Sequence, residues 1–170
     1  MLLWLMACTT AQDTGEAPPQ WVFVIDAAAW TEVLDAAEDP FDDRPQTVEC
    51  SALGYGVESS YFEVRTEDCP YGTFQQPLLA DVPEGAELQI KFWHLDLWAP
   101  KPAQGHFALR TADVTLFDTY IDIPSGSGVY AVDFTAPAPL KSGESVFFHV
   151  HNHGYNSWTL GSLEAYISPP

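Results

Sequence analysis

The segment SVFFHVHNHGYNSWTLGSLEAYI (145–167) contains two β-strand patterns on either side of a polar turn. Alternate residues of a strand point to opposite faces, so the apolar residues of SVFFHVH are expected to face a core while its histidines face away from it. Asparagine and glycine between the two patterns favour a turn. The segment therefore predicts one strand over residues 145–151 and another over residues 157–167.

Similar runs of β-type apolar residues occur along the rest of the chain, at 21–25, 61–66, 88–98, 106–110, 114–123 and 128–134. Segments rich in proline and glycine separate them, and such short connections favour antiparallel neighbours, because parallel strands need long crossovers. We therefore predict an all-β fold, an antiparallel two-sheet sandwich of jelly-roll type with about eight strands. Only residues 26–39 have a helical pattern, and they form either one short helix that begins at Asp26 and ends before Pro40 or an irregular acidic loop.

The composition excludes several classes of partner. The 170 residues are 46% hydrophobic and 14% aromatic, which is enough for one domain with a buried core. They carry 24 acidic against 6 basic side chains, a formal net charge of −18. Nucleic acid is therefore not an expected partner, because phosphate binding needs clustered Lys and Arg. Direct adsorption to an anionic membrane surface is disfavoured for the same reason.

The N-terminus contains the string Leu5-Met6-Ala7-Cys8 behind a short apolar start. This string resembles the lipobox of bacterial lipoproteins, which implies that residues 1–7 are a signal peptide and that Cys8 carries lipid. No Lys or Arg precedes the apolar start, so either the true start lies upstream of Met1 or the match is accidental.

The residues after Cys8 have the composition of a linker. Residues 8–20 are small, polar and proline-containing, and we expect them to form a flexible tether ahead of a sandwich domain over residues 21–170. Lipid on Cys8 is the membrane attachment that this sequence offers. We therefore predict an exported protein that is lipid-anchored to the bacterial cell envelope and faces either the periplasm or the cell surface.

Two further cysteines remain if Cys8 is lipidated, namely Cys50 and Cys69. Exported proteins fold in an oxidising compartment, so we expect these two to form a disulfide. A metal site built on them is disfavoured, because neither has a second cysteine nearby.

The five histidines leave two interpretations open. Imidazole is the commonest metal ligand, and two histidines at positions i and i+2 of a strand can reach one ion together with a third from a neighbouring strand. The favoured set is His94, His149 and His151, with His106 and His153 as further candidates and zinc or copper as the ion. Alternatively, the histidines satisfy hydrogen bonds in the core and at the turn. Asp96 is the candidate carboxylate to orient a ligand histidine.

A fragment of the same segment resembles a known family. Gly143, followed after five residues by His149-Val150-His151, is similar to the opening of the cupin motif, in which HxH binds a metal inside a β-barrel. This resemblance implies His149 and His151 as ligands. Tyr155 or Asn156 stands where the motif has glutamate, so only the two histidines carry over.

Aromatic and amide side chains near the same turn predict a second kind of site. Extracellular β-sandwiches often hold sugars by stacking pyranose rings on exposed aromatic rings beside polar side chains. The candidate ligand-binding residues are Asp96, Trp98, Asn152, Tyr155, Asn156 and Trp158. A core position is the alternative for the tryptophans. The acidic segment EDPFDD (38–43) is either a calcium site or a solvated turn.

The sequence thus predicts a cell-envelope lipoprotein that acts as a non-catalytic binding or structural module, with carbohydrate, another surface polymer or an envelope protein as its partner. A histidine-based metal-binding protein or small metalloenzyme is the alternative. No Ser-His-Asp or Cys-His arrangement can be identified from the sequence, and triads are assembled in space, so the sequence does not decide whether the protein is an enzyme.

Overall fold

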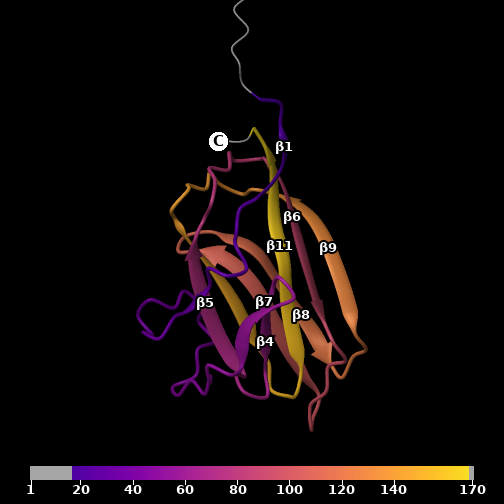
Figure 1. The fold of residues 1–170 in the computed structure, drawn as a ribbon. Helices are drawn as coiled ribbons and strands as arrows, with labels where there is room; N and C mark the ends of the chain where they lie inside the picture. Colours follow the sequence, from indigo (N-terminus) through magenta and orange to yellow (C-terminus); the bar gives the residue numbers. More distant parts are fainter. Residues whose placement is uncertain (1–16, 169–170) are drawn as a thin grey trace, which may run out of the picture.

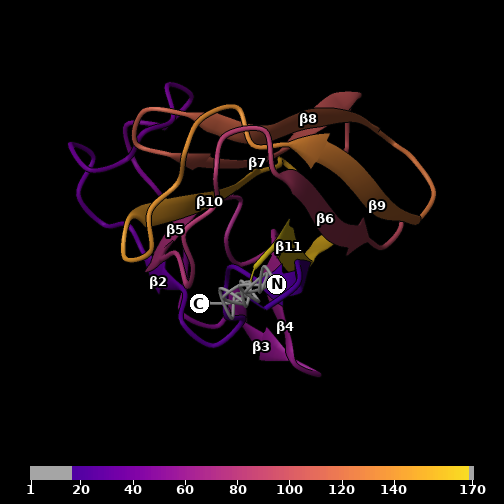
Figure 2. The same ribbon diagram turned by 90° about the horizontal axis from the view of Figure 1, so that it is seen from above.

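Eleven strands form two antiparallel sheets in the computed structural model, which describes residues 17–168 (Figures 1 and 2). The lipobox, Cys8 and most of the tether lie outside the described residues, so the lipid anchor stays a prediction. Among residues 17–168 there is no helix, and hence none that could cross a bilayer.

The first sheet has the strand order β3 (Tyr55–Glu58), β4 (Tyr61–Arg65), β11 (Ser157–Ile167), β6 (Glu87–His94) and β9 (Gly128–Thr135). A sixth strand, β1 (Gln20–Phe23), lies on the same side of β11 as β4. It pairs with residues 164–167 of β11, whereas β4 pairs with residues 157–160. The second sheet has the order β2 (Thr31–Glu32), β5 (Tyr71–Pro77), β10 (Ser145–His151), β7 (Ala103–Thr111) and β8 (Thr115–Ile123). Seen from above, the two sheets form two layers (Figure 2).

The eight strands from β4 to β11 form the predicted jelly roll. Along the chain, each of these strands belongs to the opposite sheet from the one before it, except for the β7–β8 hairpin. This alternation gives two four-stranded sheets, β4-β11-β6-β9 and β5-β10-β7-β8. Alternation between layers is the connectivity of a jelly roll, so the predicted fold class is confirmed.

Alternate residues of the strands fill the space between the sheets. In β10, Val146, Phe148 and Val150 are buried there, as their spacing predicts. The rings of Phe92 in the first sheet and Phe107 in the second stack across the interface, with centroids 4.2 Å apart. Complete burial of each such side chain contributes about 2–3 kcal/mol to folding. The opposite face of β10, which carries Phe147, His149 and His151, is therefore the outer face of the second sheet.

The predicted helix over residues 26–39 does not form, and the alternative of an irregular acidic loop is confirmed. Two residues of this segment form the edge strand β2 instead, which pairs with β5. The backbone N–H of Val33 donates to the carbonyl of Thr73 at 2.8 Å, and the N–H of Asp26 donates to Oε1 of Gln76 at 2.8 Å. The backbone thus exchanges helical hydrogen bonds for bonds to the sheet edge.

Strands β2, β3 and β5 were not predicted from the sequence. The segment of β5, YGTFQQP, has polar residues on one face and contains glycine and proline, so it lacks the apolar alternation of the other strands. It is nevertheless an inner strand, because β2 and β10 pair with its two sides.

The predicted disulfide is confirmed. Cys50 and Cys69 are bonded, and their Cα atoms are 3.9 Å apart. The bond closes a loop that contains β3 and β4, so it fastens this edge of the first sheet to the turn before β5.

Candidate functional site

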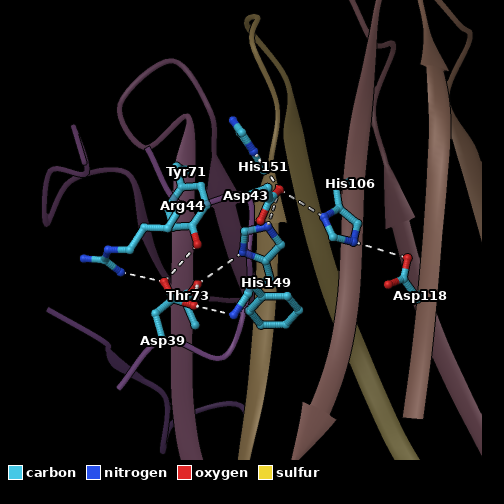
Figure 3. Close-up of polar contacts among 10 residues, drawn as sticks. Asp39, Asp43, Arg44, Tyr71, Thr73, His106, Asp118, His149 and His151 are labelled. Carbon is cyan, nitrogen blue, oxygen red and sulfur yellow. Dashed lines mark hydrogen bonds and ion pairs between the residues drawn. The ribbon is translucent and has the colours of Figure 1, made fainter. Parts of the chain in front are cut away.

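Three histidines meet one aspartate on the outer face of the second sheet (Figure 3). Strand β10 supplies His149 and His151, and the neighbouring strand β7 supplies His106, which is opposite His151 in the register. Asp43 comes from the loop over residues 33–44, which crosses this face and packs Val33 and Phe41 against Ala108 and Phe147. We call Asp43, His106, His149 and His151 the Asp43 cluster.

A buried carboxylate holds this loop in place. The side chain of Asp39 has no exposed surface, and its ion pair with Arg44 is 2.6 Å long. Asp39 also accepts hydrogen bonds from the hydroxyls of Tyr71 at 2.8 Å and Thr73 at 3.2 Å, and from the backbone N–H of Phe41 at 3.1 Å. These contacts join the loop to β5 and thereby position Asp43, four residues further along.

One oxygen of Asp43 lies close to all three imidazoles. Its Oδ2 atom is 2.8 Å from Nδ1 of His151, 3.3 Å from Nδ1 of His106 and 3.4 Å from Nε2 of His149. The Asp43 side chain is 35% exposed, whereas His149 is fully buried. The cluster therefore extends from the protein interior toward the solvent.

The outer nitrogens of two of these rings have polar partners. Nε2 of His106 lies 3.2 Å from a carboxylate oxygen of Asp118 on β8, and Nδ1 of His149 lies 3.2 Å from the hydroxyl of Thr73 on β5. The hydroxyl of Thr73 also contacts the Asp39 carboxylate, which only accepts hydrogen bonds, so Thr73 donates its one proton to Asp39. His149 must then donate from Nδ1 to Thr73, and this network assigns the tautomer.

Aromatic rings fix the orientation of the same two imidazoles. Phe41 stacks on His149 with centroids 4.3 Å apart, and Tyr120 stacks on His106 at 4.2 Å with an interplanar angle of 9°. The edge of Tyr71 contacts His149 at 4.8 Å. The rings are therefore held by packing as well as by hydrogen bonds.

Asp43 and His149 have different charge states at neutral pH. Burial lowers the pKa of His149, because the charged imidazolium would lose its hydration, and the Asp43 carboxylate opposes this shift only in part. Burial raises the pKa of Asp43, but the contacts with His106, His149 and His151 outweigh it and hold the pKa of Asp43 below its usual range. Asp43 is thus an anion beside a neutral His149.

The structure does not bring together the favoured metal set of His94, His149 and His151. His94 lies in the first sheet, where Nδ1 donates to the carbonyl of Leu95 at 2.7 Å and Nε2 is 3.1 Å from the Tyr130 hydroxyl. Its ring packs on the core residue Trp158. His94 therefore has the structural role that was the alternative interpretation, and Asp96 does not orient it.

The other histidines are also placed differently from the sequence expectations. His153 is exposed beyond the end of β10, with its ring 4.8 Å from that of His151. His149 and His151 lie on the outer face of a sheet, whereas the cupin resemblance implies a position inside a barrel. His106 takes the place that was expected for His94.

A second candidate site lies at one end of the sandwich, between the loop after β6 and the turn between β10 and β11. Trp98 and Tyr155 are exposed there, by 53% and 64%, and their rings are close to parallel, at 24° with centroids 6.0 Å apart. Beside them is a hollow of about 500 Å³, which we call the end hollow. Its lining includes Arg65, Glu67, Leu95, Asp96, Tyr155 and Asn156.

Buried amide groups hold the two aromatic loops together. The side chain of Asn156 accepts from the backbone N–H of Trp98 at 2.5 Å and donates to its carbonyl at 3.3 Å. The hydroxyl of Thr66, next to β4, lies within hydrogen-bond distance of the carbonyls of Gly154, at 2.9 Å, and Asn156, at 3.1 Å, which share its one proton. The side chain of Asn152 donates to the Thr66 hydroxyl at 3.1 Å. The rings of Trp98 and Tyr155 are therefore presented on a rigid base.

The predicted ligand-binding residues thus divide into two groups. Asp96 and Tyr155 are exposed and line the end hollow, and Trp98 is exposed beside Tyr155. Asn152 and Trp158 are fully buried, which is a correction to their expected role, because they support the loops and the core instead. Asn156 has both roles, because it lines the hollow and its side chain binds the backbone of Trp98.

Gly154 allows the two aromatic loops to approach each other. A Cβ atom at this position would lie 2.1 Å from the carbonyl oxygen of Trp98, which is part of the backbone. We therefore expect Gly154→Ala to separate the loops and to lower the free energy of unfolding by about 1–3 kcal/mol, the usual cost of overpacking. Urea denaturation measures this loss. Gly126→Ala is the control, because a Cβ there meets nothing within 4 Å, and an equal loss in both variants would contradict the close-approach argument.

Several residues that complete these sites are not evident from the sequence. Asp43 belongs to the acidic segment 38–43, for which the sequence left a calcium site or a solvated turn open, and Asp39 of the same segment binds Arg44 and the hydroxyls of β5. Thr73 and Asp118 were not identified, because their contacts with the histidines join strands that are far apart in the sequence. Within residues 17–168, Asp43, His106 and His149 are the one group of three or more ligand side chains whose geometry suits a metal ion.

Comparison with known proteins assigns this chain to no family. No family model and no curated protein sequence matches the chain. A carbohydrate binding module of family 29 is 11% identical, with 88% of this chain and 90% of that chain covered and a TM-score of 0.45. A CBM4 structure is 13% identical, with 83% and 88% covered and a TM-score of 0.44. An arabinose-bound α-L-arabinofuranosidase is 11% identical, with 90% of this chain but 27% of that chain covered and a TM-score of 0.48. The two-sheet assignment of this protein therefore rests on its own strand pairing.

Proposed function

We propose that the protein is a non-catalytic carbohydrate-binding module that holds a neutral sugar chain at the end hollow. The observation that carries this proposal is the pair of exposed, near-parallel rings of Trp98 and Tyr155 at the edge of a polar hollow. Sugar rings have an apolar face that stacks on aromatic rings and hydroxyls that need polar partners at their edges. The end hollow offers both kinds of contact side by side.

The rigid base of the two rings supports a binding role. An exposed tryptophan or tyrosine side chain does not stabilise the fold by being exposed. Hydrogen bonds of Asn156, Thr66 and Asn152 nevertheless hold the backbone of the two loops that carry Trp98 and Tyr155. A site that is ordered before the ligand arrives loses less conformational entropy on binding. Fixing the aromatic loops therefore favours ligand affinity.

The negative charge of the molecule favours neutral over acidic carbohydrates as ligands. The net charge is −18, and two of its carboxylates, those of Glu67 and Asp96, line the end hollow. Polysaccharides that carry uronic acid or sulfate groups would be repelled, so the proposed ligand is a neutral chain. The disulfide fits an oxidising compartment, where such polymers occur, and export with a lipid anchor on Cys8 forms part of the same proposal.

Polysaccharide binding tests this function directly. In native gels cast with neutral glucan, mannan, xylan or arabinan, we expect at least one polymer to retard the protein, and alginate not to do so. Trp98→Ala and Tyr155→Ala should each weaken this binding about tenfold or more, because losing a stacked ring costs more than about 1.4 kcal/mol once its buried area is included.

A matched control uses an exposed aromatic residue far from the hollow. Trp21 is 43% exposed and pairs with Tyr166 on β11, so Trp21→Ala should leave the retardation unchanged. Unaltered retardation of both the Trp98 and Tyr155 variants, or no retardation by any of the neutral polymers, would refute the proposal.

A further inference from the structure

We propose that Asp43, His106 and His149 bind a divalent transition-metal ion of the zinc class. The proposal is independent of the carbohydrate proposal, because it concerns the outer face of the second sheet rather than the loops at the end of the sandwich. It rests on the hydrogen-bond roles of the three side chains, on their spacing and on the contacts that fix them (Figure 3).

The Asp43 cluster has too few hydrogens for the polar atoms that face one another inside it. His149 donates from Nδ1 to Thr73, so in the neutral ring its Nε2 has only a lone pair. That Nε2 is completely buried, has no hydrogen-bond partner within residues 17–168, and lies 3.4 Å from the carboxylate oxygen of Asp43. A buried lone pair that faces a carboxylate oxygen is unfavourable, and a cation between the two atoms would stabilise both.

His106 repeats this arrangement. Its Nε2 is directed at the Asp118 carboxylate, which can only accept a hydrogen bond, so Nε2 carries a hydrogen and Nδ1 is the nitrogen that can bind a metal ion. This Nδ1 lies 3.3 Å from the same Asp43 oxygen. One carboxylate oxygen and two imidazole lone pairs therefore converge on one position.

The spacing of the side chains also suits a metal ion. A charge-assisted hydrogen bond from a ring N–H to a carboxylate is about 2.7–2.9 Å long, which fits the 2.8 Å contact of His151 with Asp43. The contacts of His106 and His149 are longer, at 3.3 and 3.4 Å. Ligands about 2.0–2.1 Å from a tetrahedral zinc ion lie about 3.3–3.4 Å from one another. The two longer contacts thus have the spacing of ligands, and His151 has that of a hydrogen-bond donor to the ligand Asp43.

The two ligand rings are already oriented for metal binding. Histidines that bind a metal generally donate their second nitrogen to a carboxylate, a carbonyl or water. Asp118 takes this role for His106, and Thr73, backed by Asp39, takes it for His149. The stacking of Phe41 and Tyr120 on the two imidazoles leaves them little freedom to turn away.

The chemistry of the three ligands favours zinc over calcium, and the site is open to solvent. Calcium prefers six to eight oxygen ligands and would find one here, whereas two imidazoles and a carboxylate suit zinc and similar ions. Three protein ligands leave at least one tetrahedral position for water or another small ligand. Asp43 is partly exposed, so an ion can reach the site from the solvent.

Zinc titration of the chelator-stripped, untagged protein by calorimetry tests the proposal. We expect one zinc ion per chain, no comparable heat with calcium, and visible absorption typical of tetrahedral cobalt when cobalt replaces zinc. Asp43→Ala should weaken zinc binding by more than about 100-fold, beyond the roughly 10–100-fold expected for Asp118→Asn, which removes only the partner of a ligand.

Asp42→Ala is the matched control, because it removes the same charge from the neighbouring exposed position of the same loop. It should bind zinc as the unaltered protein does. Equal weakening in the Asp42 and Asp43 variants would show that zinc is attracted only by the overall negative charge, and unchanged binding in Asp43→Ala would also overturn the proposal. Asp43 is used rather than the buried His149 so that the variant keeps its fold, which near-ultraviolet circular dichroism checks.

Discussion

Replacing Asp39 with alanine is expected to lower the free energy of unfolding by about 3–5 kcal/mol, the usual consequence of removing one partner from a buried ion pair. The Asp39 side chain has no exposed surface and receives four hydrogen bonds, from Arg44, Tyr71, Thr73 and the backbone of Phe41. Alanine would leave all four donors without their acceptor. Urea denaturation, followed by tryptophan fluorescence, measures the loss.

Two comparison variants separate the buried contacts from the charge itself. Asp42→Ala removes an exposed carboxylate of the same loop and should change stability by no more than about 0.5 kcal/mol. Asp39→Asn keeps the volume and part of the acceptor capacity, so it should lie between the two. A loss below about 1 kcal/mol for Asp39→Ala would mean that the loop contributes little to the fold.

Removing the disulfide is the second large expected effect. Cys50 and Cys69 are 19 residues apart, and a cross-link over a loop of this length is expected to contribute about 3 kcal/mol by restricting the unfolded chain. The double variant Cys50→Ala/Cys69→Ala should show this loss in urea denaturation. Reducing agent should destabilise the unaltered protein by a similar amount and should have no effect on the double variant. A difference below about 1 kcal/mol would contradict the expectation.

Removing the disulfide should also affect the end hollow. The disulfide-closed loop contains β4, which ends at Arg65, and Thr66 follows directly and holds the turn that carries Tyr155. The proposed carbohydrate binding at the end hollow should therefore weaken with the disulfide removed, even at temperatures where the protein stays folded.

The sequence predicts the strands whose apolar residues alternate or run continuously, because these patterns follow directly from burial of one face or both. It also predicts the Cys50–Cys69 bond, because only two cysteines remain after Cys8. The sequence does not predict β5. The outer face of this strand is polar, because the loop over residues 33–44 packs on it and forms hydrogen bonds with it. The helical pattern of residues 26–39 misleads for a related reason, because its apolar residues Trp30 and Val33 are buried against strands rather than along one helix face.

The Asp43 cluster shows what strand patterns can and cannot predict about a site. The spacing of His149 and His151 correctly places both on the face opposite the core. The choice of their neighbours depends on which strand lies beside β10, and the sequence does not state that this is β7 with His106 rather than β6 with His94. Asp43 comes from a loop without regular structure, so no periodic pattern could have indicated it.

The position of the last two strands has a consequence for folding. Strand β10 lies between β5 and β7, and β11 lies between β4 and β6, so the two described strands that follow all the others along the chain are inner strands of the two sheets. Only β3–β4 and β7–β8 pair as neighbours in the order of the chain. Topologies with such distant pairings fold slowly, in milliseconds to seconds. A nascent chain therefore cannot complete either sheet until residues 145–167 are available, which would suit the export proposed above.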